Sequence, residues 1–122
     1  FKIINKMGQL IRSTLHDQLS DHPFFVETHG RGLNSAFEYN CSNVHGFSLS
    51  LAQAMLNKFD ILINAKWHRT TFTPAFIISE KHVNYVLECY IQLFKEISKD
   101  WKGKIDSNIK VSRAMGGIKP GQ

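Results

Sequence analysis

Hydrophobic side chains recur every three or four residues in three segments of the chain. These segments are residues 1–19, 47–59 and 83–101. Such spacing places the apolar side chains on one face of an α-helix. Three amphipathic helices are therefore predicted, and Ser48 or Ser50 could cap the start of the second one.

Four shorter segments are rich in aromatic and β-branched residues, which favour strands. They are residues 24–28, 33–39, 60–64 and 70–78. We expect the last two to pair as a hairpin, because only a short polar turn separates them. The predicted order is helix, strand, strand, helix, strand, strand, helix. This order indicates an α+β two-layer domain, with a small, mainly antiparallel sheet of about four strands and three helices packed on one face.

Two glycines lie between the first two predicted strands, at Gly30 and Gly32. Glycine permits positive φ or a close backbone approach, so residues 29–32 are predicted to form a tight connection or a bulge. Neither Gly-x-Gly-x-x-Gly nor Gly-Lys-Ser/Thr is present, so the segment does not have the pattern of a phosphate loop.

The stretch 71–82 is the most distinctive junction in the sequence. Pro74 stiffens an apolar extended segment, Ser79 is placed to cap the following helix, and Glu80 lies where the helix dipole favours an anion. Because proline cannot donate to a strand ladder, we expect this strand to lie at a sheet edge or beside a cleft.

Residues 102–122 break the helical pattern and contain little apolar surface. We therefore divide the chain into a folded domain, 1–101, and a basic glycine-containing flexible tail. The net charge of +5 is concentrated near the C-terminus. Residues 1–98 are nearly neutral, because they carry nine basic and eight acidic side chains. A solvated tail is a better explanation of this basicity than a nucleic-acid site. The first apolar pattern begins without an initiator Met or a capping residue, so we expect a piece of a larger protein.

The histidines and cysteines do not form a recognisable metal motif. No two of the six histidines have the i,i+4 spacing of a helical zinc site, and Cys41 and His45 form only a single pair in a predicted loop. Cys41 and Cys89 are predicted to be reduced thiols. The hypothesis of a small enzyme that uses Cys41 or a histidine is the least favoured one. Without a signal peptide or an apolar run of about 18 residues, a cytoplasmic protein without a membrane span is expected.

Arg69 is the candidate binding residue among the charged side chains, although residue chemistry alone favours a solvated arginine at this position. It lies at the start of the last predicted strand, beside Trp67 and His68, where a guanidinium could hold a substrate carboxylate through two parallel hydrogen bonds. The alternative is a solvated arginine on an edge strand. Trp67, Phe72 and Phe76 could line a cleft, although burial in the core is the commoner fate of such aromatic side chains.

Three segments in order resemble the C-terminal small domain of class III (fold type I) pyridoxal-phosphate aminotransferases. Residues 29–38 resemble the family's Gly-x-Gly-Leu-Met-x-Gly-Ile-Glu strand, and residues 56–62 resemble its helix-Gly-Val-Leu segment. Residues 72–80 resemble its Pro-Pro-Leu-x-Ile-Thr-x-Glu junction. The resemblance covers about residues 1–98, and the glutamate-semialdehyde aminomutase branch, which has a related layout, is a candidate closer relative.

Several positions depart from the family pattern. Asn34 replaces a Met, Phe59 replaces the glycine that ends the middle helix, and Ala75 replaces the second proline. Some members carry a substrate-carboxylate arginine three residues before the first proline, and Thr71 stands at that position here. Arg69 lies two residues earlier, on the same face of a strand, and could substitute by a shift along the strand.

The resemblance implies a role for the chain within a parent enzyme. The family's Schiff-base lysine, the acid that pairs with the pyridine nitrogen and most phosphate contacts belong to the large domain, so we expect pyridoxal phosphate in the full-length parent and none bound to this chain alone. The implied partners are that large domain, a second subunit of a homodimer and a small amino-acid or keto-acid substrate. The implied function is a mobile cover of the substrate cleft that is not catalytic by itself.

The alternative is a stand-alone α+β module that binds a protein or a nucleic acid. Such a module should show an even polar surface and a salt-sensitive affinity for its partner. An amputated domain should instead expose an apolar patch, which is the interface that the missing domain would cover.

Overall fold

The computed structural model describes residues 2–32, 34–72 and 80–101, and within this part it contains three helices and four strands. In chain order the elements are α1 (Lys2–Leu19), β1 (Phe25–Arg31), β2 (Asn34–Tyr39), α2 (Val44–Phe59), β3 (Asn64–Lys66), β4 (Arg69–Phe72) and α3 (Glu80–Lys99).

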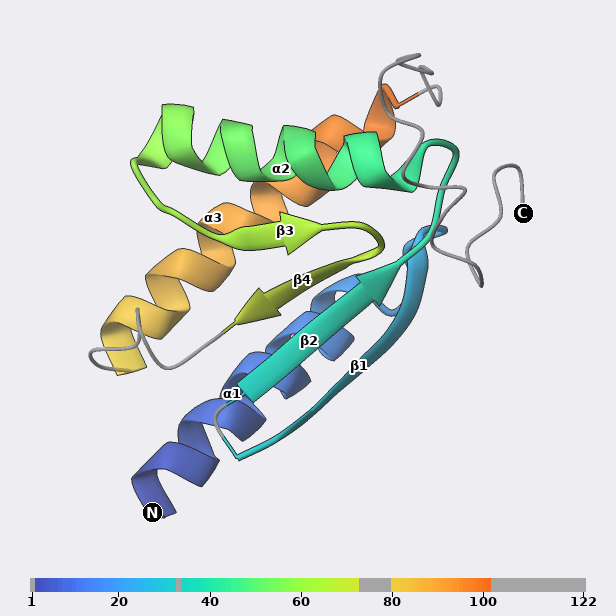
Figure 1. Cartoon of the computed structure of the whole chain (residues 1–122). Helices are drawn as coiled ribbons and strands as arrows, with labels where there is room; N and C mark the ends of the chain where they lie inside the picture. Colours follow the sequence, from blue (N-terminus) through green and yellow to red (C-terminus); the bar gives the residue numbers. More distant parts are fainter. Residues whose placement is uncertain (1, 33, 73–79, 102–122) are drawn as a thin grey trace.

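The strands form one antiparallel sheet in the order β1-β2-β4-β3. In Figure 1, α1 and α3 lie behind the sheet, and α2 crosses the end of the molecule beside β3. All three helices bury apolar side chains in one core with the sheet. The predicted α+β fold with a four-stranded antiparallel sheet and three helices is therefore confirmed, and so is the β3–β4 hairpin.

Aromatic side chains from both layers meet at the centre of the core. The Phe94 ring of α3 lies 5.2–5.3 Å, centroid to centroid, from Phe37, Tyr39 and Phe47, which belong to β2 and α2. These four side chains are completely buried. Edge-to-face contacts of this kind add to the hydrophobic energy of burial. The cluster fixes the sheet against both helices, so one face of the sheet is committed to the core.

The first hairpin differs from its prediction. Residues 29–31 continue strand β1 instead of forming the turn, and Arg31 pairs with Asn34. Gly30 fits here because a Cβ atom at this position would lie 2.2 Å from the Asn34 carbonyl oxygen. The glycine therefore serves a close approach between two strands, and the predicted connection at 29–32 was placed too early.

Helix α2 and strand β3 are also shifted from their predicted bounds. The helix begins at Val44, after Asn43 in the left-handed conformation, so the prediction of a cap at Ser48 or Ser50 was wrong. After the helix, Asp60 adopts φ 58° and the backbone N–H of Ile61 donates to Met55. This capping turn uses the start of the predicted 60–64 strand, and β3 begins only at Asn64.

Strand β4 ends at Phe72 in the described part of the chain, and α3 begins at Glu80. The predictions for Pro74, Phe76 and the Ser79 cap lie outside the described residues, as does the predicted tail 102–122.

Candidate functional site

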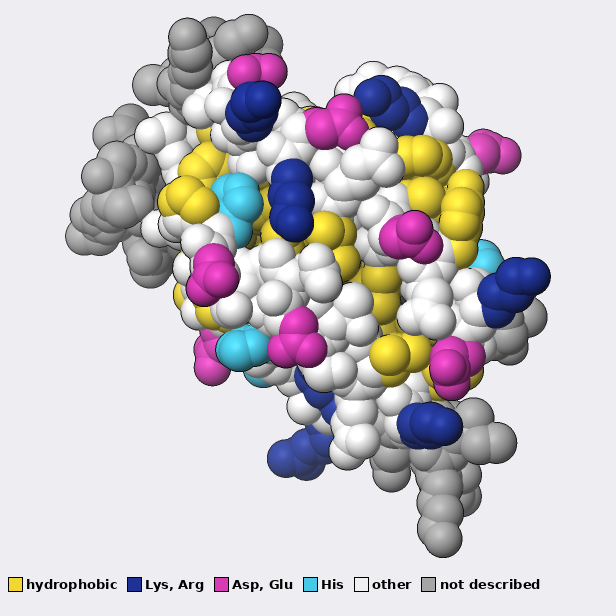
Figure 2. Space-filling view, turned by 180° about the vertical axis from the view of Figure 1, so that it is seen from behind, with side chains coloured by type: hydrophobic (Ala, Val, Ile, Leu, Met, Phe, Trp, Pro, Cys, Tyr) yellow, Lys and Arg dark blue, Asp and Glu magenta, His cyan; other side chains and the backbone are white. Residues whose placement is uncertain are grey.

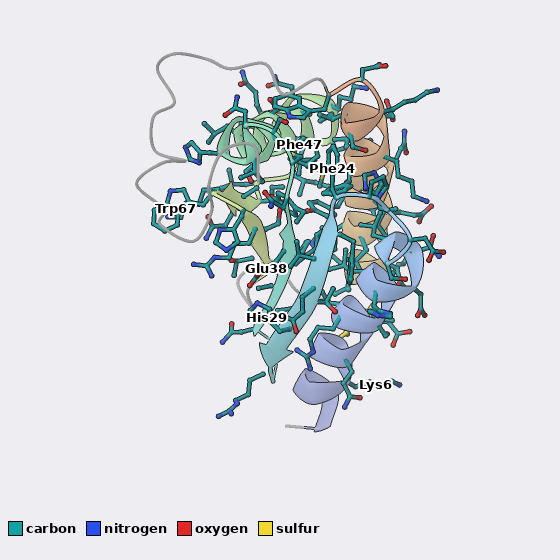
Figure 3. All side chains as sticks on the ribbon, turned by 90° about the vertical axis from the view of Figure 1, so that its right-hand side faces the viewer. Lys6, Phe24, His29, Glu38, Phe47 and Trp67 are labelled. Carbon is teal, nitrogen blue, oxygen red and sulfur yellow. The ribbon has the colours of Figure 1, made fainter. Side chains whose placement is uncertain are left out.

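Strand β4 presents Arg69 and Thr71 on the face of the sheet that the helices leave open. Thr70 and Phe72 are fully buried, and the alternating Arg69 and Thr71 are half-buried. Since successive side chains of a strand point to opposite faces, the two predicted residues share the face away from the core. In Figure 3, Glu38 and Trp67 lie on the side of the sheet away from α1 and α3. Their role in binding remains a prediction.

Glu38 of β2 is the carboxylate nearest to Arg69 in the strand register, but it already has partners. Its two oxygens face the Nε2 atoms of His29, at 2.5 Å, and of His68, at 3.9 Å. The register also places Glu27 opposite Glu38. Among the described residues, no carboxylate lies within ion-pair distance of the Arg69 guanidinium. Since the Arg69 guanidinium has no carboxylate partner in the described part of the chain, its planar fork of five donors could bind an anion.

His68 is neutral in this environment at neutral pH. Burial lowers the pKa of its imidazole, Arg69 lowers it further, and Glu38 acts in the opposite direction. Its Nδ1 atom is buried and makes no hydrogen bond within the described part of the chain. The positive charge at this point of the open face therefore comes from Arg69 and from Lys66, its partner in the strand register.

Trp67 is the residue whose conformation the sequence did not reveal. Lys66 pairs with Arg69, so Trp67 and His68 form a two-residue turn, and Trp67 has φ 59°. Its backbone N–H donates to Nδ1 of His45 at 3.0 Å, and its carbonyl accepts from the Ser48 hydroxyl at 2.7 Å. These two partners on α2 are about 20 residues away in sequence, so local pattern analysis could not find them.

A chain of buried hydroxyl groups supports this turn from inside the core. Tyr90 donates to Thr70 at 2.8 Å, Thr70 and Tyr39 are 3.0 Å apart, and Tyr39 and Ser48 are 2.7 Å apart. Because Ser48 donates to the Trp67 carbonyl, each hydroxyl can donate one bond along this chain, and Thr70, Tyr39 and Ser48 can each also accept one. Burial raises the pKa of Tyr39 to about 12 and that of Tyr90 well above its ordinary value, so both keep their protons.

Other residues considered from sequence have structural environments. Phe72 is completely buried in the core and does not line a cleft, whereas Trp67 is 38% exposed. Burial raises the pKa of the Cys41 thiol to about 12, which disfavours the thiolate that a nucleophile requires. Within the described ranges, no three His, Cys, Asp or Glu side chains are grouped so that they could hold a metal ion, and no helix could span a membrane.

Two shallow hollows lie beside helix α1, and neither is lined by Arg69 or Thr71. The first, about 580 Å³ between α1 and β1, contains Arg12, but its guanidinium is bound to the Gly32 and Asn34 carbonyls and to Ser35. The second, about 530 Å³, lies between α1 and α3 over Leu87 and Ile91. Figure 2 shows this side of the molecule, where acidic and basic side chains alternate around strips of hydrophobic surface. This mixture does not form the single-sign patch that a nucleic acid requires.

The described residues do not fit covalent attachment of pyridoxal phosphate. That attachment requires a lysine held beside the cofactor and an acidic partner for the ring nitrogen. The lysines whose side chains are described are all exposed: Lys6, Lys58, Lys66, Lys81, Lys95 and Lys99.

The fold is similar to part of several solved aminotransferase structures. The ornithine aminotransferase of Toxoplasma gondii is 20% identical with a TM-score of 0.66, over 80% of this chain and 23% of that chain. The acetylornithine aminotransferase of Elizabethkingia anophelis is 19% identical with a TM-score of 0.65, over 76% of this chain and 24% of that chain. A thermostable omega transaminase is 23% identical with a TM-score of 0.67, over 79% and 23% of the two chains.

No sequence model of a protein family matches the chain. A comparison with curated protein sequences gives no match. The chain spans about a quarter of the length of the aminotransferase structures to which its fold is similar. Its fold resembles the small domain of class III aminotransferases, a family that uses pyridoxal phosphate.

Proposed function

We infer that the chain is the C-terminal small domain of a class III pyridoxal-phosphate aminotransferase and covers the substrate cleft of that enzyme. The observation that carries this inference is the fold similarity, which extends over 76–80% of this chain and only 23–25% of each aminotransferase. The order of sequence landmarks in residues 29–80 supports the same family.

The open face of the sheet is the surface proposed to meet the large domain. It carries half-buried polar groups, among them Glu38, Arg69 and Thr71, and no described helix covers it. A surface with groups held in place and without a covering layer is suited to a partner domain of the same chain. The large domain would hold pyridoxal phosphate, and the parent is proposed to be a cytoplasmic homodimer.

Arg69 is the residue proposed to bind the carboxylate of a small amino acid or keto acid. Its guanidinium has no competing carboxylate in the described structure, since Glu38 is bound by His29. Thr71 lies on the same strand face and could donate a hydrogen bond to the same ligand. Together they would orient the substrate, while closure of the domain excludes water.

The test is transamination by the product of the complete reading frame that contains this chain. We expect Arg69→Gln to lower kcat/KM roughly 10- to 100-fold, which is the loss of a charge-assisted hydrogen bond. Thr71→Val should have a smaller effect. Arg31→Gln is the matched control, because Arg31 lies on β1, separated from β4 by β2.

The 122-residue chain alone should neither transaminate nor develop the absorption band of lysine-bound pyridoxal phosphate. Activity of this chain by itself, or a complete reading frame whose product shows no amino transfer, would contradict the proposal.

A further inference from the structure

Helix α2 carries a hydrophobic stripe on a side that does not face the core. Successive members of this α2 stripe are four, three and four residues apart, a spacing that aligns them along one side of a helix: His45, Leu49, Ala52 and Leu56. Leu49 is 43% exposed and Leu56 is 45% exposed, whereas the core-facing residues of α2 are buried. In Figure 1, α2 crosses the end of the molecule, and no described helix covers its outer side. Two exposed leucines with a small alanine between them form the pattern by which one helix packs against another.

The two ends of α2 lack charges of opposite sign. A helix N-terminus carries partial positive charge, and the first turn of α2 contains no acidic residue. At the other end, Asp60 places a carboxylate beside the partial negative charge of the helix C-terminus. Lys58, the basic residue of the last turn, lies 3.5 Å from Glu96 of α3 and is already paired. A helix that packs antiparallel to α2 and carries the same charges would therefore place a carboxylate at the N-terminus of α2 and a positive helix end beside Asp60.

A second copy of α2 meets these requirements under two-fold symmetry. If Leu49 of each copy lies opposite Leu56 of the other, Asp60 lies opposite His45, because both of these residues are four positions further along. Nδ1 of His45 accepts from the Trp67 backbone N–H at 3.0 Å. The neutral imidazole therefore carries its proton on Nε2, which can donate to a carboxylate of the other copy.

We propose that the α2 stripe is a self-association surface, on which two copies of the chain pack their α2 helices antiparallel. Ala52 lies near the two-fold axis, where its small side chain permits the helix axes to approach to about 8–10 Å. A helix of 16 residues is only about 24 Å long, so the contact is smaller than a standard protein interface. We therefore expect a weak dimer, with a Kd of roughly 10⁻⁵ to 10⁻³ M. This inference goes beyond the proposed function and does not depend on it, because it concerns association of the chain and not a reaction.

The experiment is sedimentation equilibrium of the 122-residue chain at concentrations from about 10 µM to about 1 mM. We expect the mean molar mass to rise with concentration from that of one chain toward that of two. Leu49→Lys and Leu56→Glu should each weaken the association at least roughly tenfold, because each places a charge against a leucine of the other copy. Val26→Lys is the matched control, since Val26 is 49% exposed and lies on β1, at the opposite edge of the sheet from β3.

The double variant L49K/L56E tests the antiparallel register. Each introduced cation would lie opposite an introduced carboxylate of the other copy, so we expect the double variant to associate more tightly than either single variant and to lose this gain at high salt. Asp60→Asn removes the charge and keeps a residue that tolerates positive φ, and it should weaken the wild-type dimer roughly three- to tenfold. Urea unfolding at about 10 µM, where the chain is mostly monomeric, should show that the leucine variants remain folded.

A wild-type chain that stays monomeric at the highest concentration would overturn the second copy as the occupant of the α2 stripe and would favour another domain of the parent enzyme. Association that survives both single leucine substitutions, or that is lost in Val26→Lys, would also overturn the proposal. Folded double variants that remain as monomeric as the single variants would overturn the antiparallel register. Transamination by the complete enzyme is a separate readout, so failure of the proposed function would leave these results unchanged.

Discussion

Two histidines in this domain are hydrogen-bond acceptors for backbone N–H groups, and this role requires the neutral imidazole. Nδ1 of His22 accepts from Phe24 at 3.0 Å, and its Nε2 then donates to the Ser98 hydroxyl at 2.7 Å. Nδ1 of His45 accepts from Trp67 at 3.0 Å. A protonated imidazole has no acceptor, so protonation would break both backbone contacts.

The free energy of unfolding should therefore decrease as the pH falls below about 6.5. Burial lowers the pKa of His22, with a further contribution from Lys95, and burial also lowers the pKa of His45 and His68. In that pH range the unfolded chain binds protons that the native chain does not, so acid favours unfolding. Urea unfolding at pH 7.5 and pH 5.5 measures the difference.

Variants can assign this pH dependence to the two acceptors. His45→Asn retains an acceptor atom that does not titrate, so stability should depend less on pH than in the wild type. His16→Gln is the control, because His16 is exposed on α1 and its side chain is not an acceptor for a backbone N–H in the described part of the chain. Equal or greater stability at pH 5.5 than at pH 7.5 would contradict this account of His22 and His45.

At the level of elements, helix α2 ends without the glycine that commonly follows a helix, and Asp60 takes that left-handed position. Asp60 follows the helix with φ 58° and ψ 35°, and its N–H donates to the Leu56 carbonyl at 3.0 Å. The left-handed position is thus one residue after Phe59, which the family resemblance placed at the glycine. A carboxylate at a helix C-terminus also faces the negative end of the dipole.

Asp60→Gly should increase the free energy of unfolding by about 0.5–1 kcal/mol, because it removes both the left-handed penalty and the unfavourable charge. Asp60→Ala is the matched comparison, since it removes the charge and keeps the Cβ atom in the left-handed region. Urea unfolding of the two variants should rank glycine above alanine. The opposite ranking would show that backbone strain at this position is negligible.

The same element shows what the sequence could and could not predict. The helices were predicted because their apolar stripes are long, and the order of elements followed from them. The start of β3 was missed because the capping turn at Asp60 and Ile61 depends on hydrogen bonds that periodicity does not encode. Arg69 and Thr71 were placed on one face by the two-residue period of a strand. The engagement of Glu38 and the strain at Trp67 depend on contacts between elements, so no local pattern contained them.

At the scale of the whole molecule, the two faces of the sheet differ. One face is sealed by α1, α2 and α3 around the aromatic cluster, and the other presents positioned polar groups without a covering helix in the described residues. This asymmetry supports the proposal that the chain covers the substrate cleft of a larger enzyme.

The coding sequence upstream of Phe1 tests this assignment most directly. The chain matches 23–25% of each similar aminotransferase, so we predict that the same reading frame encodes a large domain about three times as long as this chain, with the lysine that binds pyridoxal phosphate. A start codon immediately before Phe1, or an upstream domain without such a lysine, would contradict the account.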